Sequence, residues 1–305
     1  MKIKNIHARE ILNSGGTTSI EVEVVLENGV KDGASVPFGV SSGAHEAYVL
    51  FDGGTRYGGK GMLKAVKNVN TEIREALVGK DAGDQRAIDQ ILIELDGTPN
   101  KMRLGANAIL GVSLASARAQ AKSEGLELYE HIARITNYEL RITNYELPSP
   151  MMVVIEGGKH ADNSTDFQEY LIVPRVTNEA GVYSARESIR CGAEVYLALK
   201  KVLKENGFNT NVGNEGAFAP EGIRLNAEPW DLIMEAIDRA GYAPGKDVML
   251  AADLAASEFA RDIGAGLPED RDDDILFSQD VHSPSEHIIQ YQLTREIKID
   301  RKSVV

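Results

Sequence analysis

The chain opens with an alternation of apolar and polar positions. Ile20, Val22 and Val24 are separated by glutamates, which predicts a strand with one buried face. Residues 28–29 are Asn-Gly, the dipeptide most typical of a tight hairpin turn, and residues 34–37 supply a returning strand. We therefore predict an antiparallel strand pair here.

Apolar side chains then recur every three or four positions, which predicts helices. A second helix is expected to begin at an Asp84 cap and to stop at Gly97, and a third spans residues 104–122. Strands followed by several helices are typical of a small α+β domain. The first of these helices ends near Gly79 and has its apolar positions at Met62, Ala65, Val66, Val69 and Ile73.

The second half of the chain mixes strand-like and helix-like segments. Two helices are predicted over residues 179–206 and 226–240, the latter with Asn226 as its N-cap. Short apolar runs before and after them are typical of buried strands, and the whole order favours an α/β architecture. The predicted strands are residues 151–155, 170–174 and 248–253.

A heptad is repeated between the two halves. Arg-Ile-Thr-Asn-Tyr-Glu-Leu occupies residues 134–140 and again 141–147, just before Pro-Ser-Pro. Two copies are too few for a solenoid, so we interpret the repeat as a duplication in a tolerant linker. The predicted domains are residues 1–133, a linker at 134–150, a second domain at 151–299 and a non-native tail at 300–305.

Charge and cysteine content exclude some partners and compartments. The 33 basic and 46 acidic residues give a net charge of −13, which argues against nucleic acid as the main partner. The single cysteine, Cys191, lies in a helical pattern as a small core residue and fits a reducing compartment. The sequence has no apolar run long enough for a bilayer and no signal peptide, which predicts a cytoplasmic location.

One acidic side chain lies in an apolar, glycine-rich loop, residues 211–220. Gly213 and Gly216 flank Glu215, and a carboxylic acid in dry surroundings can hold a proton for general-acid catalysis. Taken alone, the segment is more simply an ordinary turn with a solvated glutamate. However, Glu169 and Asp253 also lie near predicted strand ends. The three acids together favour a metal and acid–base site at one rim of a barrel.

Several separate segments resemble the enolase family, the phosphopyruvate hydratases. The resemblance implies a small α+β domain followed by an incomplete (β/α)8 barrel. It also implies a Mg²⁺-dependent lyase of glycolysis that removes water from 2-phosphoglycerate to form phosphoenolpyruvate, usually as a homodimer or a larger oligomer. The matching segments are residues 34–47, 104–113, 151–152, 157–163, 168–169 and 252–259.

The resemblance implies roles for particular side chains. Glu215 matches the acid that helps hydroxide leave, and Glu169 matches the residue that assists it. Substrate contacts would come from His160, Gln168 and Glu169. The Mg²⁺ ligands would be Asp253 and Ser41, the latter in the Gly- and Ser-rich loop at residues 38–46.

The chain departs from the family pattern in several places. Asn214 replaces an aspartate, and Glu156 replaces an asparagine, which adds a negative charge near His160. The base lysine, a second lysine, two further acidic metal ligands and an arginine–serine phosphate clamp of the family have no match in these residues. We therefore expect a truncated, poorly stable and inactive chain. Two alternatives stay open: a non-catalytic binding or moonlighting protein with this fold, and another proton-abstracting member of the wider superfamily.

Overall fold

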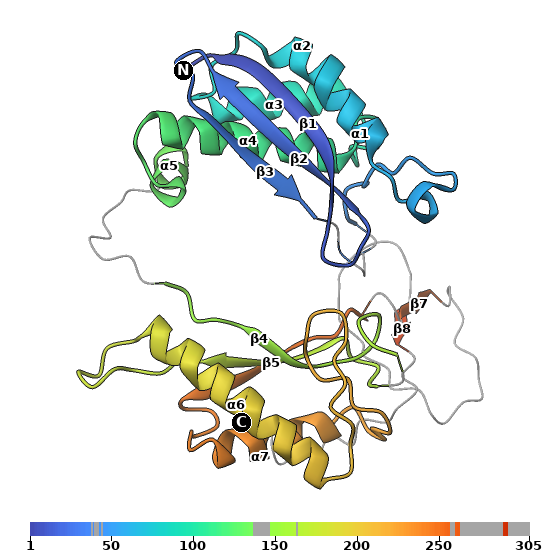
Figure 1. The fold of residues 1–305 in the computed structure, drawn as a ribbon, viewed down its shortest axis with the longest axis vertical. Helices are drawn as coiled ribbons and strands as arrows, with labels where there is room; N and C mark the ends of the chain where they lie inside the picture. Colours follow the sequence, from blue (N-terminus) through green and yellow to red (C-terminus); the bar gives the residue numbers. More distant parts are fainter. Residues whose placement is uncertain are drawn as a thin grey trace. The chain divides into compact units, whose positions relative to one another are not determined.

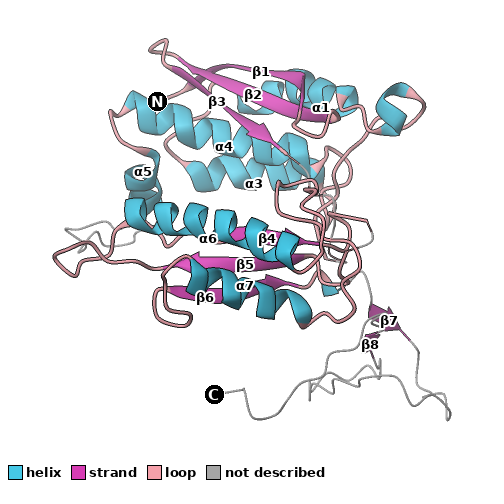
Figure 2. Ribbon diagram, turned by 60° about the horizontal axis from the view of Figure 1, so that its bottom comes forward, coloured by secondary structure: helices cyan, strands magenta, loops and turns pink. Residues whose placement is uncertain are grey.

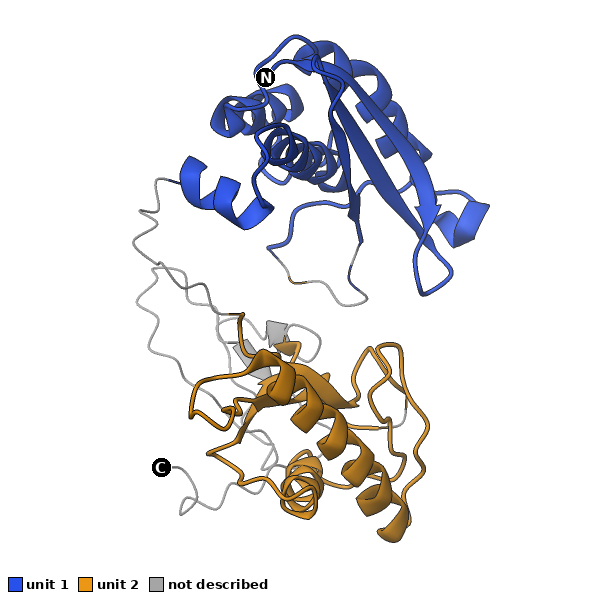
Figure 3. Cartoon of the chain, turned by 60° about the vertical axis from the view of Figure 1, so that its left-hand side comes forward, with its two compact units in different colours: residues 1–39, 44–145 blue, residues 40–43, 146–305 orange. Residues whose placement is uncertain are grey.

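The computed structural model describes residues 1–37, 39, 43, 45–136, 147–162 and 164–256, and the backbone of residues 260–262 and 289–291. The chain divides into two compact units, residues 1–39 with 44–145 and residues 40–43 with 146–305 (Figure 3). Each unit has its own hydrophobic core. Ser41, most of the repeated heptad and the predicted tail lie outside the described residues.

The first unit is built on a three-stranded antiparallel sheet. Its strands, in spatial order, are β1 (Ile3–Leu12), β2 (Thr18–Leu26) and β3 (Lys31–Val36). Ile20, Val22 and Val24 are fully buried, which confirms the predicted half-buried strand. The pairing of Val22 with Ala34 confirms the hairpin. β1 lacks a clean alternation because its register shifts near its start.

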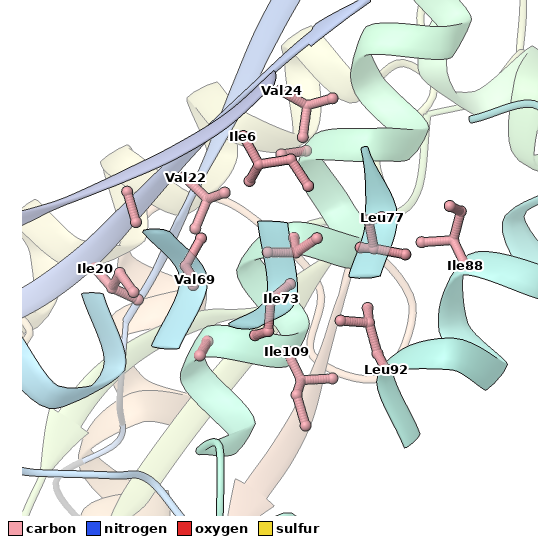
Figure 4. Close-up of a cluster of buried hydrophobic side chains, with 14 of the residues drawn as sticks. Ile6, Ile20, Val22, Val24, Val69, Ile73, Leu77, Ile88, Leu92 and Ile109 are labelled. Carbon is pink, nitrogen blue, oxygen red and sulfur yellow. The ribbon is translucent and has the colours of Figure 1, made fainter. Parts of the chain in front are cut away.

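Helices cover one face of this sheet (Figures 1 and 2). Figure 4 shows the core between them, where Ile6 and Val22 of the strands point toward Val69 and Ile73 of the helical layer, and Leu92 belongs to the same cluster. The helical segments are η1 (Arg56–Gly59), α1 (Leu63–Asn68), η2 (Val69–Ile73), α2 (Arg74–Leu77), α3 (Gln85–Asp96), α4 (Ala106–Ser123) and α5 (Leu128–Ile135).

The predicted helix boundaries of this unit are largely confirmed. Asp84 caps α3, because its side chain accepts a 3.0 Å hydrogen bond from the Ala87 amide. Gly97 ends the same helix in a left-handed conformation, with φ of 70°. The first predicted helix runs through α1, η2 and α2, and η2 is a π-helical turn that apolar spacing does not reveal.

The second unit places two helices on a three-stranded sheet (Figure 1). Its strands lie in the order β4 (Met152–Glu156), β5 (Glu169–Pro174) and β6 (Val248–Asp253), and the helices are α6 (Ala185–Glu205) and α7 (Glu228–Arg239). β5 runs antiparallel to both neighbours. Two short strands, β7 (Ala260–Asp262) and β8 (Ile289–Tyr291), pair with each other.

Two sequence-based boundaries in this unit are wrong. The helix expected from residue 179 begins at Ala185, because Ser184 caps it and the preceding segment turns around the Asn178 side chain. Asn226 is not the N-cap of α7, whose cap position is Ala227. The Asn226 side chain instead donates to Asp166 at 2.9 Å, a tertiary contact that local sequence does not specify. Cys191 is buried in α6, as predicted.

Candidate functional site

Three carboxylates meet at one end of the second sheet. Glu156 pairs with Glu169 across β4 and β5, and Glu169 pairs with Asp253 across β5 and β6. Glu156 and Asp253 are the last residues of their strands, whereas Glu169 is the first of its own. Because β5 runs in the opposite direction, its beginning lies beside the ends of its neighbours. The acidic rim expected from an α/β barrel is thus assembled from antiparallel strands.

His160 reaches this edge from the loop between β4 and β5. Its amide donates to the Gly157 carbonyl at 2.9 Å, which folds the loop back over the strand end. The imidazole Nδ1 lies 3.5 Å from a Glu169 oxygen and 3.8 Å from oxygens of Glu156 and Glu215. The side chain is 5% exposed. Within the described part of the chain, Nδ1 has no hydrogen-bond partner.

The loop that carries Glu215 is held against β4 by backbone hydrogen bonds. Phe218 donates to the Val154 carbonyl at 3.0 Å and accepts from the Glu156 amide at 2.9 Å. The Glu215 amide lies 3.3 Å from both Glu156 carboxylate oxygens. A Cβ on Gly213 would come within 2.4 Å of the same carboxylate, so the close approach requires glycine there. These contacts bring Glu215 to the sheet edge from far along the chain.

The dry surroundings predicted for Glu215 enclose Glu156 instead. Ala217 and Phe218 are buried as expected, but the Glu215 side chain is 46% exposed. Glu156 is fully buried. Burial raises the pKa of the Glu156 carboxyl, although the Glu215 amide and the His160 imidazole act in the opposite direction. The carboxyl of Glu156 is therefore held towards its protonated form.

Glu169 is the second carboxyl with a raised pKa. Burial is the largest cause, and the negative charges of Glu215 and Asp253 add to it. Among the neighbours that most affect this group, only the His160 imidazole favours the charged form. Negative charge is thus concentrated at this edge, which favours either a retained proton or a bound cation.

The remaining predicted site residues have different environments. Gln168 is buried beside Glu169, and within the described residues its Oε1 has no hydrogen-bond partner. Asp253 is exposed, and one of its oxygens accepts from the Ala255 amide at 2.9 Å. Ser41 cannot be placed, since it lies outside the described residues.

Glu156 is the site member that sequence reasoning missed. From the sequence it stands out only as a departure from the family pattern, although its position after an apolar run is itself a signal. An acidic residue directly after an apolar run sits at a strand end, where it is drawn into the protein if the next loop folds back. Here residues 151–155 are that run, and the loops carrying His160 and Gly213 close over the carboxylate.

We expect Glu156→Gln to stabilise the folded chain at neutral pH in metal-free buffer. The pKa of Glu156 is raised above its ordinary value of 4.5, so the folded state binds more protons than the unfolded state. The free energy of unfolding therefore falls as the pH rises from 4.5 through the raised pKa. An amide cannot ionise, so the variant should gain on the order of 1 kcal/mol at neutral pH and little at acidic pH.

Urea unfolding of both proteins across this pH range measures the effect. The other titratable groups near Glu156 are His160, Glu169, Glu215 and Tyr196, and all are present in both proteins. Glu205→Gln, at a side chain that is 59% exposed, is the control and should leave the pH dependence unchanged. A Glu156→Gln protein that is no more stable than wild type at neutral pH would contradict the expectation.

Two family models match the chain. The model described as "Enolase, N-terminal domain" matches residues 3–132, and the model described as "Enolase, C-terminal TIM barrel domain" matches residues 144–294. Within the described residues, no helix combines the length and the apolar character needed to cross a membrane.

Proposed function

This chain belongs to the enolase family, and from that premise we propose that its acidic edge is the proton-donating side of a dehydration site. The reaction is the conversion of 2-phosphoglycerate to phosphoenolpyruvate, a carbon–oxygen lyase step of glycolysis and gluconeogenesis. The expected fold, an α+β domain followed by part of an enolase-type barrel, is confirmed by the two matches. The observation that carries the proposal is the convergence of Glu169, His160 and Glu215.

The chemistry assigns separate tasks to these residues. Loss of water requires a proton on the departing hydroxyl, and Glu215 is the acid whose side chain extends into solvent where a substrate could meet it. Glu169, with its raised pKa, is suited to retain a proton and to restore it to Glu215. His160 lies within 3.8 Å of both carboxylates and is suited to orient substrate against them. Gln168 offers an amide for a substrate oxygen.

The enolase family uses Mg²⁺, and the chemistry of the edge fits such an ion. Asp253 provides a carboxylate at an exposed strand end, and hard oxygen ligands are those that Mg²⁺ prefers. The negative neighbours that raise the pKa of Glu169 would be partly neutralised by a cation there. We propose Asp253 and Ser41 as its ligands. When bound, Mg²⁺ stabilises the negative charge that builds up on the substrate carboxylate.

A complementation assay tests this function. No position in these 305 residues matches the base lysine or the phosphate clamp implied by the family. We therefore expect the 305-residue polypeptide alone to form no phosphoenolpyruvate. A fusion protein that joins residues 1–298 to the remaining barrel segment of another enolase should form phosphoenolpyruvate in a Mg²⁺-dependent manner. Turnover by the polypeptide alone would contradict the first expectation, and a folded but inactive fusion would contradict the proposed function.

A folded, inactive fusion would favour a non-catalytic binding protein that keeps the enolase fold. The specific observation behind this alternative is Glu156, which places a buried carboxyl where the family resemblance implies a neutral amide. We also propose a cytoplasmic location and a homodimer or larger oligomer, both from family membership, with no nucleic acid as partner given the net charge of −13.

A further inference from the structure

The imidazole of His160 has an unusual surrounding for a buried histidine. Its Nδ1 faces three carboxylates, yet the separations of 3.5 to 3.8 Å exceed the usual 2.7–3.2 Å of a hydrogen bond. If Nδ1 carries a proton, that proton lacks a well-placed acceptor. If it does not, its lone pair faces carboxyl groups that are too distant to donate a hydrogen bond to it. Either arrangement is costly for a residue that is 6% exposed. A cation shared among these groups would relieve both problems.

The spacing of the ligand atoms suits a small four-coordinate ion. One atom each from Glu156, His160 and Glu215 lies within 4.8 Å of the others. A tetrahedral ion with bonds of about 2.0–2.1 Å separates neighbouring ligand atoms by about 3.4 Å. The 3.8 Å distances from Nδ1 to the two carboxylates are a few tenths of an ångström longer, and the Glu156 and Glu215 oxygens lie within 4.8 Å of each other. Ion binding therefore requires the half-exposed Glu215 side chain to move inward.

The groups around the cluster already orient two of these ligands. The Glu156 carboxylate is held by the Glu215 amide at 3.3 Å, and the absent side chain of Gly213 leaves room for it. The His160 backbone is fixed at both ends, because its amide donates to Gly157 and its carbonyl accepts from Asn214. Such supporting contacts are what metal ligands need in order to point at a common centre.

We propose that Glu156, His160 and Glu215 form a binding site for a divalent transition-metal ion of the Zn²⁺ class. An imidazole combined with carboxylates is a donor set that suits Zn²⁺ and its neighbours, whereas Mg²⁺ prefers oxygen ligands only. The site differs in ligands from the Mg²⁺ position proposed at Asp253. It shares residues with the proposed dehydration site, but it requires no substrate and no turnover.

Metal titration of the complete 305-residue chain tests the site. The affinity for Zn²⁺ is measured by competition with a chromophoric chelator, without substrate. His160→Gln and Glu215→Gln should each lower the affinity at least tenfold. Glu215 is 46% exposed, so its replacement should leave the fold intact. Glu156→Gln should lower the affinity similarly, although it is expected to raise stability without metal. His7→Gln removes an exposed imidazole in the first unit and should change nothing.

Cobalt supplies an independent readout of the ligand geometry. Co²⁺ bound to the wild-type chain should give the intense visible absorption of a four-coordinate ion, and His160→Gln should lose it. Zn²⁺ affinity that is equal in the wild type, His160→Gln and Glu215→Gln would overturn the proposal, as would only the weak bands of six-coordinate Co²⁺. Asp253→Asn separates the two sites, because it should weaken Mg²⁺ binding and leave Zn²⁺ binding unchanged. Failure of the dehydration assay has no bearing on these measurements.

Discussion

Gly157→Ala should displace or unfold the loop that carries His160. A Cβ at this position would lie 2.1 Å from the Thr165 hydroxyl oxygen, 2.5 Å from its carbonyl oxygen and 2.8 Å from its amide nitrogen. The hydroxyl can rotate away, but the two backbone atoms can move only if the loop moves. The expected loss in free energy of unfolding is about 3 kcal/mol, at the upper end of overpacking effects. Urea unfolding of the variant measures it.

Gly192→Ala is the matched control. A Cβ there would meet the Met152 sulfur at 2.1 Å and its terminal carbon at 2.9 Å, which belong to the end of a flexible side chain. Gly192 also lies inside α6, where alanine is favoured by about 1 kcal/mol over glycine. We expect a net change below about 1 kcal/mol. Equal losses in both variants would show that the backbone contact at Thr165 is not the cause.

Glu215→Gln should abolish most catalysis in the complemented enzyme. Glutamine has nearly the same shape but has no acidic proton to give, so the hydroxyl would have to leave without assistance. Removal of a general acid typically lowers kcat by about 10²–10⁴-fold. Because the side chain is 46% exposed, stability should be nearly unchanged. The rate of phosphoenolpyruvate formation at saturating substrate measures the effect.

Glu205→Gln provides the comparison for this experiment as well. It removes an exposed acid at the end of α6 that pairs with Arg239 and is not a member of the cluster. Its kcat should match that of the parent fusion. Full activity in Glu215→Gln would show that Glu215 is not the general acid, and Glu169 would then be the candidate for that role.

Local signals in the sequence predicted many elements correctly. The alternation at Ile20, Val22 and Val24 identified β2, and the Asp84 cap identified the start of α3, because both depend on neighbouring residues only. The direction of β5 could not be predicted in this way. A buried apolar strand has the same composition whether its partners run parallel or antiparallel, and the choice depends on segments as distant as β6.

Most members of the candidate site could be predicted from the sequence, but their environments could not. Glu169, Glu215 and Asp253 were expected to gather at one rim, and the structure brings Glu169 beside both of the others. The environment of each carboxyl was not predictable, because it depends on how two separate loops close. Apolar neighbours along the chain suggested a dry Glu215, whereas folding placed those neighbours in the core and left that side chain half-exposed.

The loop between β4 and β5 leaves the sheet and returns to it at the same edge. Its base is closed by a 3.0 Å hydrogen bond from the Gly157 amide to the Gln168 carbonyl. The end of the loop is anchored as well, because Phe167 belongs to the core of the unit and Asp166 accepts a hydrogen bond from the Asn226 side chain. A grafted segment that changes ligand specificity would therefore replace residues 159–162 only, with Gly157 and residues 164–168 kept as fixed junctions.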